Sequence, residues 1–175
     1  MEKKFIGRFQ VYTGDGKGKT TAALGLALRA CGAGLRVFIG QFIKGMAYAE
    51  LAVIKERLEG VELAQYGRDC FITKAPTEAD IALAQNGLLD LRERMLSGRY
   101  EVIIADELNI AVHLGLVSIE EVLSLINERP EGVELVLTGR YAHEKIIEAA
   151  DLATEMREVK HYYKSGLQAR YGIEK

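Results

Sequence analysis

A glycine-rich segment at residues 14–21, GDGKGKTT, contains the residue types that bind phosphate. Its glycines at 14, 16 and 18 allow backbone conformations that a Cβ would block, and these turn successive N–H groups toward an anion. Lys19 supplies a positive charge for phosphate oxygens, and Thr20 supplies a hydroxyl for a metal ion. A helix expected to follow adds the positive end of its dipole. The segment therefore predicts a nucleoside triphosphate site with a metal ion beside it.

The loop departs from the usual G-x-x-x-x-G-K-[ST] pattern at its first position, where Thr13 stands in place of glycine. The expected strand before the loop and the expected helix after it have the right places, so the context supports the assignment. Lys17 has two interpretations, a second phosphate ligand or a solvated loop charge.

Two acids follow an apolar run in the segment 102–109, VIIADELN. A carboxylate at the end of a buried strand can hold Mg²⁺ directly or through water. Either Asp106 or Glu107 could be the ligand. The alternative is an acid that favours a helix start, but the phosphate-binding loop elsewhere in the chain favours the metal role. Asn109 could bond to nearby backbone or contact a ligand.

Arg140 follows another expected strand, and its guanidinium could bind phosphate through two hydrogen bonds. An exposed arginine in a turn explains the same spacing equally well. The segment 66–72 is loop-like but contains Phe71, which either packs into the core or lines a pocket for a flat apolar ligand. The histidines, at 113, 143 and 161, lack metal-binding or nucleophilic spacing, so structural or surface roles are expected.

The elements that must position these residues alternate between strand and helix. Strands are expected at residues 9–12, 37–45, 61–66, 102–105, 133–138 and 152–159, and helices at 20–33, 47–58, 77–96, 118–127 and 143–150. Thr77 and Ser118 are expected to cap their helices. Such alternation predicts an α/β fold with a mainly parallel sheet and helices on both faces. Ligands bind at the carboxyl ends of such strands, where the segments above lie.

The composition fits an ordinary globular protein, with 175 residues, 49% hydrophobic and 27% charged, and we expect one domain over 1–175. The net charge of −2 gives no basic field for nucleic acid. No apolar run suits a membrane span or a signal peptide. Cys31 and Cys70 match no metal or disulfide spacing, so a cytoplasmic location is expected.

A set of short segments runs in order along nearly the whole chain: YTGDGKGKTTAA at 12–23, QFIKG at 41–45, DEL at 106–108, LTGR at 137–140, AD, TEM and VKH within 150–161, and GIE at 172–174. Together these segments resemble the P-loop-type ATP:corrinoid adenosyltransferases, which act on cob(I)alamin or cob(I)yrinic acid a,c-diamide. The loop itself fits, because that family has the form GxGKGKTT. QFIKG and the closing VKH and GIE elements are much more specific than the loop.

The resemblance implies a P-loop NTPase-like (RecA-like) fold and a reaction unlike phosphoryl transfer. ATP is expected to lie in reversed sense, Co(I) of a reduced corrinoid attacks its 5′ carbon, and inorganic triphosphate leaves. Because Co(I) is already a strong nucleophile, no activating base is required. The tasks of the protein are alignment and stabilisation of the leaving triphosphate. The product serves adenosylcobalamin biosynthesis or salvage.

The resemblance also implies roles for individual residues. Lys19, Thr20 and Glu107 are expected to be catalytic. Mg²⁺ (or Mn²⁺) is expected on Thr20 and Glu107, with Asp106 possible as the direct ligand. Phe71 is the candidate that displaces the lower axial ligand of the corrinoid. ATP contacts are expected from the loop and from one residue after a strand: Thr13, Gly14, Asp15, Gly16, Lys17, Gly18, Lys19, Thr20, Thr21 and Arg140.

The implied partners are ATP, the corrinoid, a flavodoxin-like reductant and a second copy of the chain in a homodimer, with no nucleic acid and no membrane. Only a few residues precede the first strand, so the N-terminal lid of longer relatives is expected to be shortened or absent. The main alternative is a generic P-loop phosphotransferase or kinase acting on a small molecule. Such an enzyme is expected to have an arginine-rich lid. An ATP-dependent switch or RecA-like motor would want a basic face. The sequence shows neither feature.

Overall fold

A computed structural model describes residues 5–46, 48–68 and 75–174. Within this part of the chain, six strands form one sheet in the order β3-β2-β4-β5-β1-β6, and every pair is parallel. The predicted α/β fold with a mainly parallel sheet is therefore confirmed. The strands are β1 (Phe9–Thr13), β2 (Val37–Phe42), β3 (Val61–Tyr66), β4 (Val102–Asp106), β5 (Glu134–Thr138) and β6 (Leu152–Glu155).

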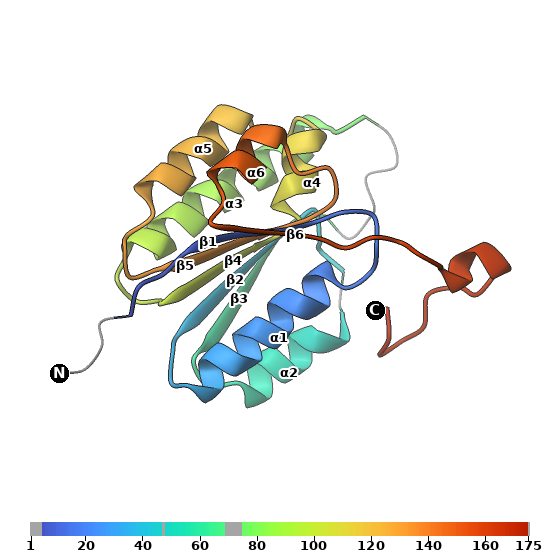
Figure 1. Cartoon of the computed structure of the whole chain (residues 1–175), viewed down its shortest axis with the longest axis horizontal. Coiled ribbons are helices and arrows are strands. Elements are labelled where there is room, and N and C mark those ends of the chain that lie inside the picture. The colour runs from blue at the N-terminus through green and yellow to red at the C-terminus, as the bar shows by residue number, and fades with distance from the viewer. Residues whose placement is uncertain (1–4, 47, 69–74, 175) are drawn as a thin grey trace.

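Helices cover both faces of the sheet (Figure 1). One face carries α1 (Lys19–Gly32) and α2 (Ala49–Arg57). A short 3₁₀ helix, η1 (Tyr162–Ser165), lies in the C-terminal segment, residues 156–174, which projects from the sheet beyond β6. The other face carries α3 (Glu78–Leu96), α4 (Leu108–His113), α5 (Ile119–Glu128) and α6 (Glu144–Ala149).

Two helix starts match the sequence signals closely. The hydroxyl of Thr77 accepts a hydrogen bond from the backbone N–H of Asp80 at 3.3 Å, and the carboxylate of Asp80 accepts from the backbone of Thr77 at 2.9 Å. Ser118 and Glu121 make the same reciprocal pair at the start of α5. Each capping box satisfies backbone donors that the helix leaves unpaired, so both predicted caps are confirmed.

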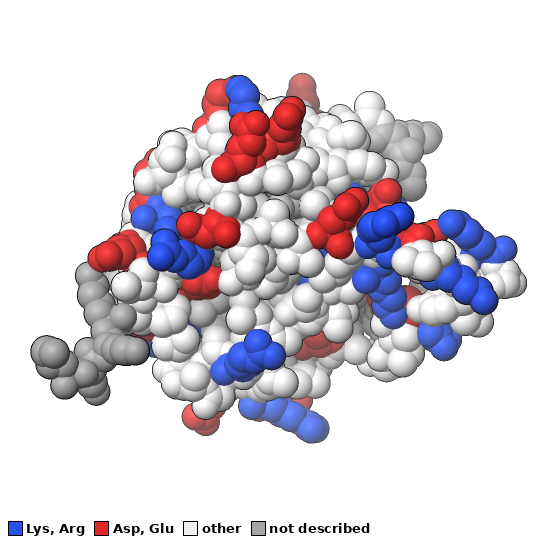
Figure 2. Space-filling view, in the orientation of Figure 1, with Lys and Arg blue, Asp and Glu red and all other residues white. Residues whose placement is uncertain are grey.

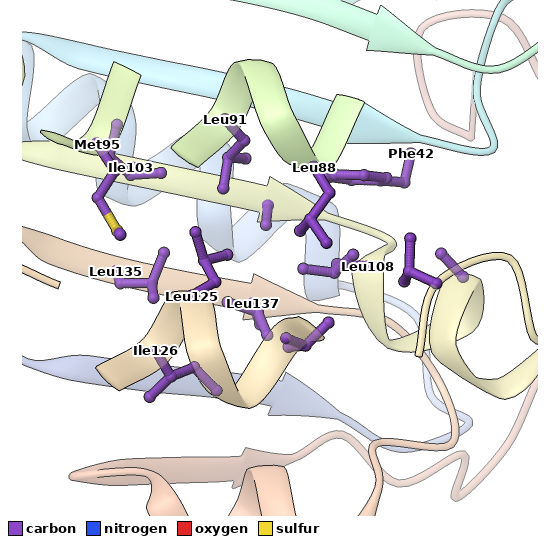
Figure 3. Packing of buried hydrophobic residues seen from close by; sticks show 14 of the residues in the cluster. Phe42, Leu88, Leu91, Met95, Ile103, Leu108, Leu125, Ile126, Leu135 and Leu137 are labelled. Atoms are coloured by element: carbon purple, nitrogen blue, oxygen red, sulfur yellow. The ribbon is translucent and has the colours of Figure 1, made fainter. Parts of the chain in front are cut away.

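The core explains why the strand ends are held firmly in place. Successive residues of a strand point to opposite faces, so Ile103 packs toward α3 and α5 while Ile104 packs toward α1. Burying an aliphatic side chain of this size contributes about 1.5–3 kcal/mol. Figure 3 shows the layer between the sheet and helices α3 and α5, built from Leu88, Leu91, Met95, Ile103, Leu125, Ile126, Leu135 and Leu137.

The structure differs from the expected elements at strand ends and in short helices. β2 stops at Phe42, because Ile43 has a left-handed φ of 63° that no strand residue adopts. β6 stops at Glu155, because the chain then meets the glycine loop, where the backbone N–H of Gly16 donates to Met156 O at 2.6 Å. The six-residue helix α4 and the four-residue η1 were not predicted.

Among residues 5–46, 48–68 and 75–174, no helix has the length and apolar character that a bilayer span needs.

Candidate active site

The loop between β1 and α1 has the backbone that its glycines predict. Gly14 and Gly18 have φ values of 93° and 121°, which residues with a Cβ rarely adopt. A Cβ at Gly14 would lie 2.5 Å from Met156 O, and one at Gly16 would lie 2.6 Å from it. Glycine is therefore required both for the curl of the loop and for the close approach of the C-terminal segment.

Lys19 lies inside the loop and is only 7% exposed. Its ammonium group donates hydrogen bonds to Gly14 O at 2.7 Å and to Gly16 O at 2.8 Å. Burial lowers the pKa of Lys19, and the nearby carboxylate of Glu107 opposes this effect. An anion placed at the loop would relieve that cost, because it favours the charged form of the lysine.

Side chains from the loop and from the ends of β2 and β5 converge on the carboxylate of Asp106, the last residue of β4, which is 1% exposed. Its Oδ1 accepts hydrogen bonds from the hydroxyls of Thr138 at 2.6 Å and Thr20 at 3.0 Å. Its Oδ2 accepts from the ammonium of Lys44 at 2.7 Å and from the amide of Gln41 at 3.3 Å. Four donors around one buried carboxylate satisfy it without any bound ligand.

Lys44 makes two polar contacts in the same place. Besides its ion pair with Asp106, its ammonium donates to the hydroxyl oxygen of Thr20 at 3.1 Å. Burial acts to lower the pKa of Lys44, but the charge and the hydrogen bond of Asp106 outweigh it and the pKa is raised. The lysine is therefore a cation at neutral pH.

Glu107 occupies the turn from β4 into α4 with a left-handed φ of 62°. Its backbone N–H donates to the hydroxyl of Thr138 at 3.0 Å, which fixes the turn against the end of β5. Burial, and then the neighbouring carboxylate of Asp106, raise the pKa of Glu107. A Cβ at Gly139 would lie 3.3 Å from Glu107 Oε2, so this glycine leaves room for the carboxylate.

Asn109 and Arg140 lie close to this turn. Asn109 is fully buried; its Nδ2 donates to Gly139 O at 3.3 Å, and its Oδ1 has no partner within the described residues. Arg140 is exposed. It lines an open hollow of about 580 Å³ beside the loop, a volume that suits a small molecule. The lining residues are Asp15, Arg140, Tyr141, Glu155, Arg157, Glu158 and Lys164.

Residues 6–174 match the family model described as ATP:corrinoid adenosyltransferase BtuR/CobO/CobP. The chain belongs to this family. The corrinoid adenosyltransferases of Pseudomonas aeruginosa PAO1 and Escherichia coli K12 are 37% and 35% identical to it over 165 residues, covering 94% of this chain and 81% and 83% of theirs. The corrinoid adenosyltransferase CobA of Salmonella typhimurium is 37% identical over 169 residues, covering 94% of this chain and 83% of its own. The predicted resemblance is confirmed.

This family member brings most of its predicted site residues to one end of the sheet. Lys19 and Thr20 lie in the loop, with Asp106 and Glu107 across from them. Lys17 instead contacts the C-terminal segment: its ammonium donates to Glu174 Oε1 at 3.0 Å and to Ile173 O at 3.1 Å. The predicted corrinoid residue, Phe71, lies outside the described residues, as does Cys70.

Sequence reasoning used QFIKG only as a mark of the family and did not predict its contacts with Asp106. Gln41 and Lys44 both bond to Asp106, and Thr138 of the LTGR segment does the same. A polar side chain at or just after the carboxyl end of a buried apolar strand was the available signal. That signal places these residues at the ligand-binding edge of the sheet, but it does not show that Asp106 is their common partner.

The side chains of Thr20, in the loop, and of Asp106 and Glu107, across from it, fit a magnesium ion that binds together with a triphosphate. The hydroxyl of Thr20 and the carboxylate of Asp106 offer oxygen atoms 3.0 Å apart, with Glu107 as a neighbouring carboxylate. Within the described part of the chain, no cluster of three or more His, Cys, Asp or Glu forms a cage for a metal. Mg²⁺ commonly uses one or two carboxylates and completes its shell with water and substrate phosphates.

Proposed function

We propose that the protein transfers the 5′-deoxyadenosyl group of ATP to the Co(I) centre of a reduced corrinoid, in adenosylcobalamin biosynthesis or salvage. A cobalt–carbon bond forms at C5′ with the electron pair of Co(I). The bond from C5′ to the phosphate oxygen breaks, and triphosphate leaves with that bonding pair. The match of residues 6–174 to the adenosyltransferase family carries the proposal.

The charges at the loop suit the departure of a triphosphate. Lys19 is a buried cation at this edge of the sheet, and Arg140 is an exposed one beside it. Fixed cations act on charge that develops in the transition state without having to reorganise. We assign the ATP contacts to residues 13–21 and Arg140, with the loop holding the triphosphate end.

Mg²⁺ (or Mn²⁺) belongs to the same proposal, with Thr20 as one ligand. The second ligand is Glu107, as the resemblance implies, or Asp106, which already bonds to Thr20. When bound, the ion would neutralise the leaving triphosphate. The residues of the chain hold the ion and align the phosphates, and Lys19 contributes its charge from inside the loop.

The remaining parts of the proposal rest on the resemblance. Residues 1–175 would act as one domain in a cytoplasmic homodimer, and Phe71 would contact the corrinoid. Reduction of the corrinoid would come from a flavodoxin-like protein.

Product analysis tests the reaction directly. The protein is incubated with ATP, Mg²⁺ and chemically reduced cobalamin, and phosphate products are separated by ion-exchange chromatography. We expect inorganic triphosphate and a light-sensitive cobalt–carbon product in equal amounts. ADP or orthophosphate as the sole product would refute adenosyl transfer and favour a phosphotransferase.

A further inference from the structure

The segment QFIKG places a lysine where the proposed reaction does not require one. Lys44 Nζ lies 2.7 Å from Asp106 Oδ2 and 3.1 Å from Thr20 Oγ1. These are two of the oxygen atoms offered to the metal ion. The ammonium therefore bridges the hydroxyl and the carboxylate at the position that suits the ion.

An ammonium group and Mg²⁺ compete for the same electron pairs. Lys44 donates up to three hydrogen bonds and accepts none, so it contacts Thr20 and Asp106 through their lone pairs. Mg²⁺ binds oxygen lone pairs at a shorter distance, about 2.0–2.1 Å, and needs them free. Both cations cannot use the same lone pairs of Asp106 at once, so binding of one must weaken binding of the other.

The burial of Asp106 explains why a cation is needed there before the metal arrives. Its side chain is 2% exposed and that of Lys44 is 15% exposed. A buried carboxylate without a counter-charge is strongly unfavourable. Hydrogen bonds from Thr138 and Gln41 lower that cost, but Lys44 is the cation that contacts the carboxylate among the described residues.

The backbone on both sides of Lys44 has a constrained conformation that positions this lysine. Ile43, a β-branched residue, has a left-handed φ of 63°, a conformation that is unfavourable for such a side chain. Gly45 packs so closely on the next chain segment that a Cβ there would lie 2.4 Å from Gly67 O. The centroid of the Tyr48 ring lies 5.5 Å from the Lys44 ammonium, so the lysine has a cation–π contact in addition to its ion pair with Asp106.

We propose that Lys44 is a placeholder cation: its ammonium neutralises Asp106 and positions Thr20 while the metal is absent, and binding of the metal displaces it. Lys44 is thus a positioning residue for the metal ligands. The displaced ammonium remains beside the ring of Tyr48.

A purely structural ion pair makes a different prediction from a placeholder. If Lys44 only stabilised the fold, its loss would lower the melting temperature equally with and without metal. A placeholder competes with the metal, so its loss should be compensated by metal and should increase the affinity for metal.

The test compares Lys44→Met with the wild-type protein, using Mn²⁺ binding followed by electron paramagnetic resonance without nucleotide. We expect Mn²⁺ to bind roughly tenfold more tightly to Lys44→Met, an ordinary size for coupling between two binding events. In EDTA the melting temperature should fall by about 5 °C or more, and saturating Mg²⁺ should restore most of the loss. Should the variant be unfolded in EDTA, refolding on addition of Mn²⁺, followed by circular dichroism, would be the supporting result.

Three further variants make the test specific. Lys55→Met, an exposed lysine in α2, should leave the Mn²⁺ affinity and the melting temperature unchanged. Lys44→Arg keeps a cation and should bind Mn²⁺ no more tightly than the wild type. Asp106→Asn should lose the Mn²⁺ site. Equal or weaker Mn²⁺ binding by Lys44→Met, or binding that survives Asp106→Asn, would overturn the inference.

This inference rests on the metal position in the proposed function, but the two can fail separately. Tighter Mn²⁺ binding by Lys44→Met in a protein that releases no triphosphate would refute adenosyl transfer and leave the placeholder role in place. Triphosphate release together with an unchanged Mn²⁺ affinity in Lys44→Met would refute the placeholder role alone.

Discussion

At the scale of single residues, two lysines hold their charge in different ways. Lys19 is surrounded by loop carbonyls and its pKa is lowered by burial, whereas Lys44 faces the carboxylate of Asp106 and its pKa is raised. The motif at 14–21 was enough to predict the first lysine. The second could not be paired from the sequence, because 61 intervening residues separate Lys44 from Asp106 and no spacing rule connects them.

Lys19→Ala should abolish most turnover while leaving the fold intact. The side chain supplies one fixed cation to the leaving group, and removal of a single such group typically costs about 100- to 1,000-fold in rate. Initial rates of triphosphate release, with circular dichroism and the melting temperature as folding controls, measure the effect. Lys55→Ala is the matched control for loss of a lysine charge. Activity within tenfold of the wild type in Lys19→Ala would remove the loop lysine from the mechanism.

At the scale of elements, close packing between α3 and β3 supports the strand that lies beside β2. Gly87 of α3 faces the ring of Tyr66, whose ring centroid lies 5.2 Å from that of Phe42 at the end of β2. The sequence predicted α3 and β3 with the correct type and nearly the correct bounds. It did not show that a glycine inside α3 was needed for their contact. In a sequence, a glycine within a helical pattern indicates only a residue of low helix propensity.

Gly87→Ala should destabilise the protein by about 1–3 kcal/mol, because its Cβ would lie 2.3 Å from Tyr66 Cγ and the ring would have to move. Gly25→Ala in α1 is the matched control: a Cβ there meets nothing within 4 Å, and the better helix propensity should stabilise by roughly 0.5–1 kcal/mol. Urea unfolding measures both. A stabilised Gly87→Ala would mean that Tyr66 does not pack on α3 in this way.

At the scale of the whole molecule, the C-terminal segment returns to the glycine loop near the other end of the chain. Met156 O accepts a hydrogen bond from the backbone N–H of Gly16 at 2.6 Å, and Glu174 accepts from the ammonium of Lys17. Glu174 also accepts from the hydroxyl of Tyr162 and from the backbone N–H of Arg170 at 2.8 Å. Figure 2 shows Lys and Arg side chains gathered where this segment projects.

Hydrogen bonds from Arg170, and then from Tyr162, hold the pKa of Glu174 far below its ordinary value of 4.5. Because the folded pKa is lowered, the contribution of this carboxylate to holding the segment is complete above pH 4.5 and is lost as the pH falls toward the lowered value. The ¹³C carboxyl chemical shift of Glu174 should therefore stay that of an ionised group through pH 4.5. Titration with an ordinary midpoint would contradict the contacts that hold the segment.

Glu174→Ala should loosen the C-terminal segment without disturbing the sheet. Its carboxylate is the common partner of Lys17, Tyr162 and Arg170, so its loss releases all three contacts together. We expect faster trypsin cleavage within residues 157–170 and an unchanged melting transition of the core, measured by mass spectrometry and circular dichroism. Glu148→Ala, an exposed glutamate in α6, is the control and should cleave at the wild-type rate.

The sequence by itself determined the elements of the sheet, the glycine loop with Lys19 and Thr20, and the placement of Asp106 and Glu107 at a strand end. These features depend on local signals, namely apolar periodicity, glycine conformation and capping residues. Each of these signals is carried by residues that lie within a few positions of one another in the sequence. Only the tertiary structure decided that β2 lies beside β4, and that Ile43 bends Lys44 onto Asp106 and Thr20. It also placed Glu174 on Lys17, 157 positions away. Such contacts depend on strand order and on how the chain closes on itself, and residue spacing encodes neither.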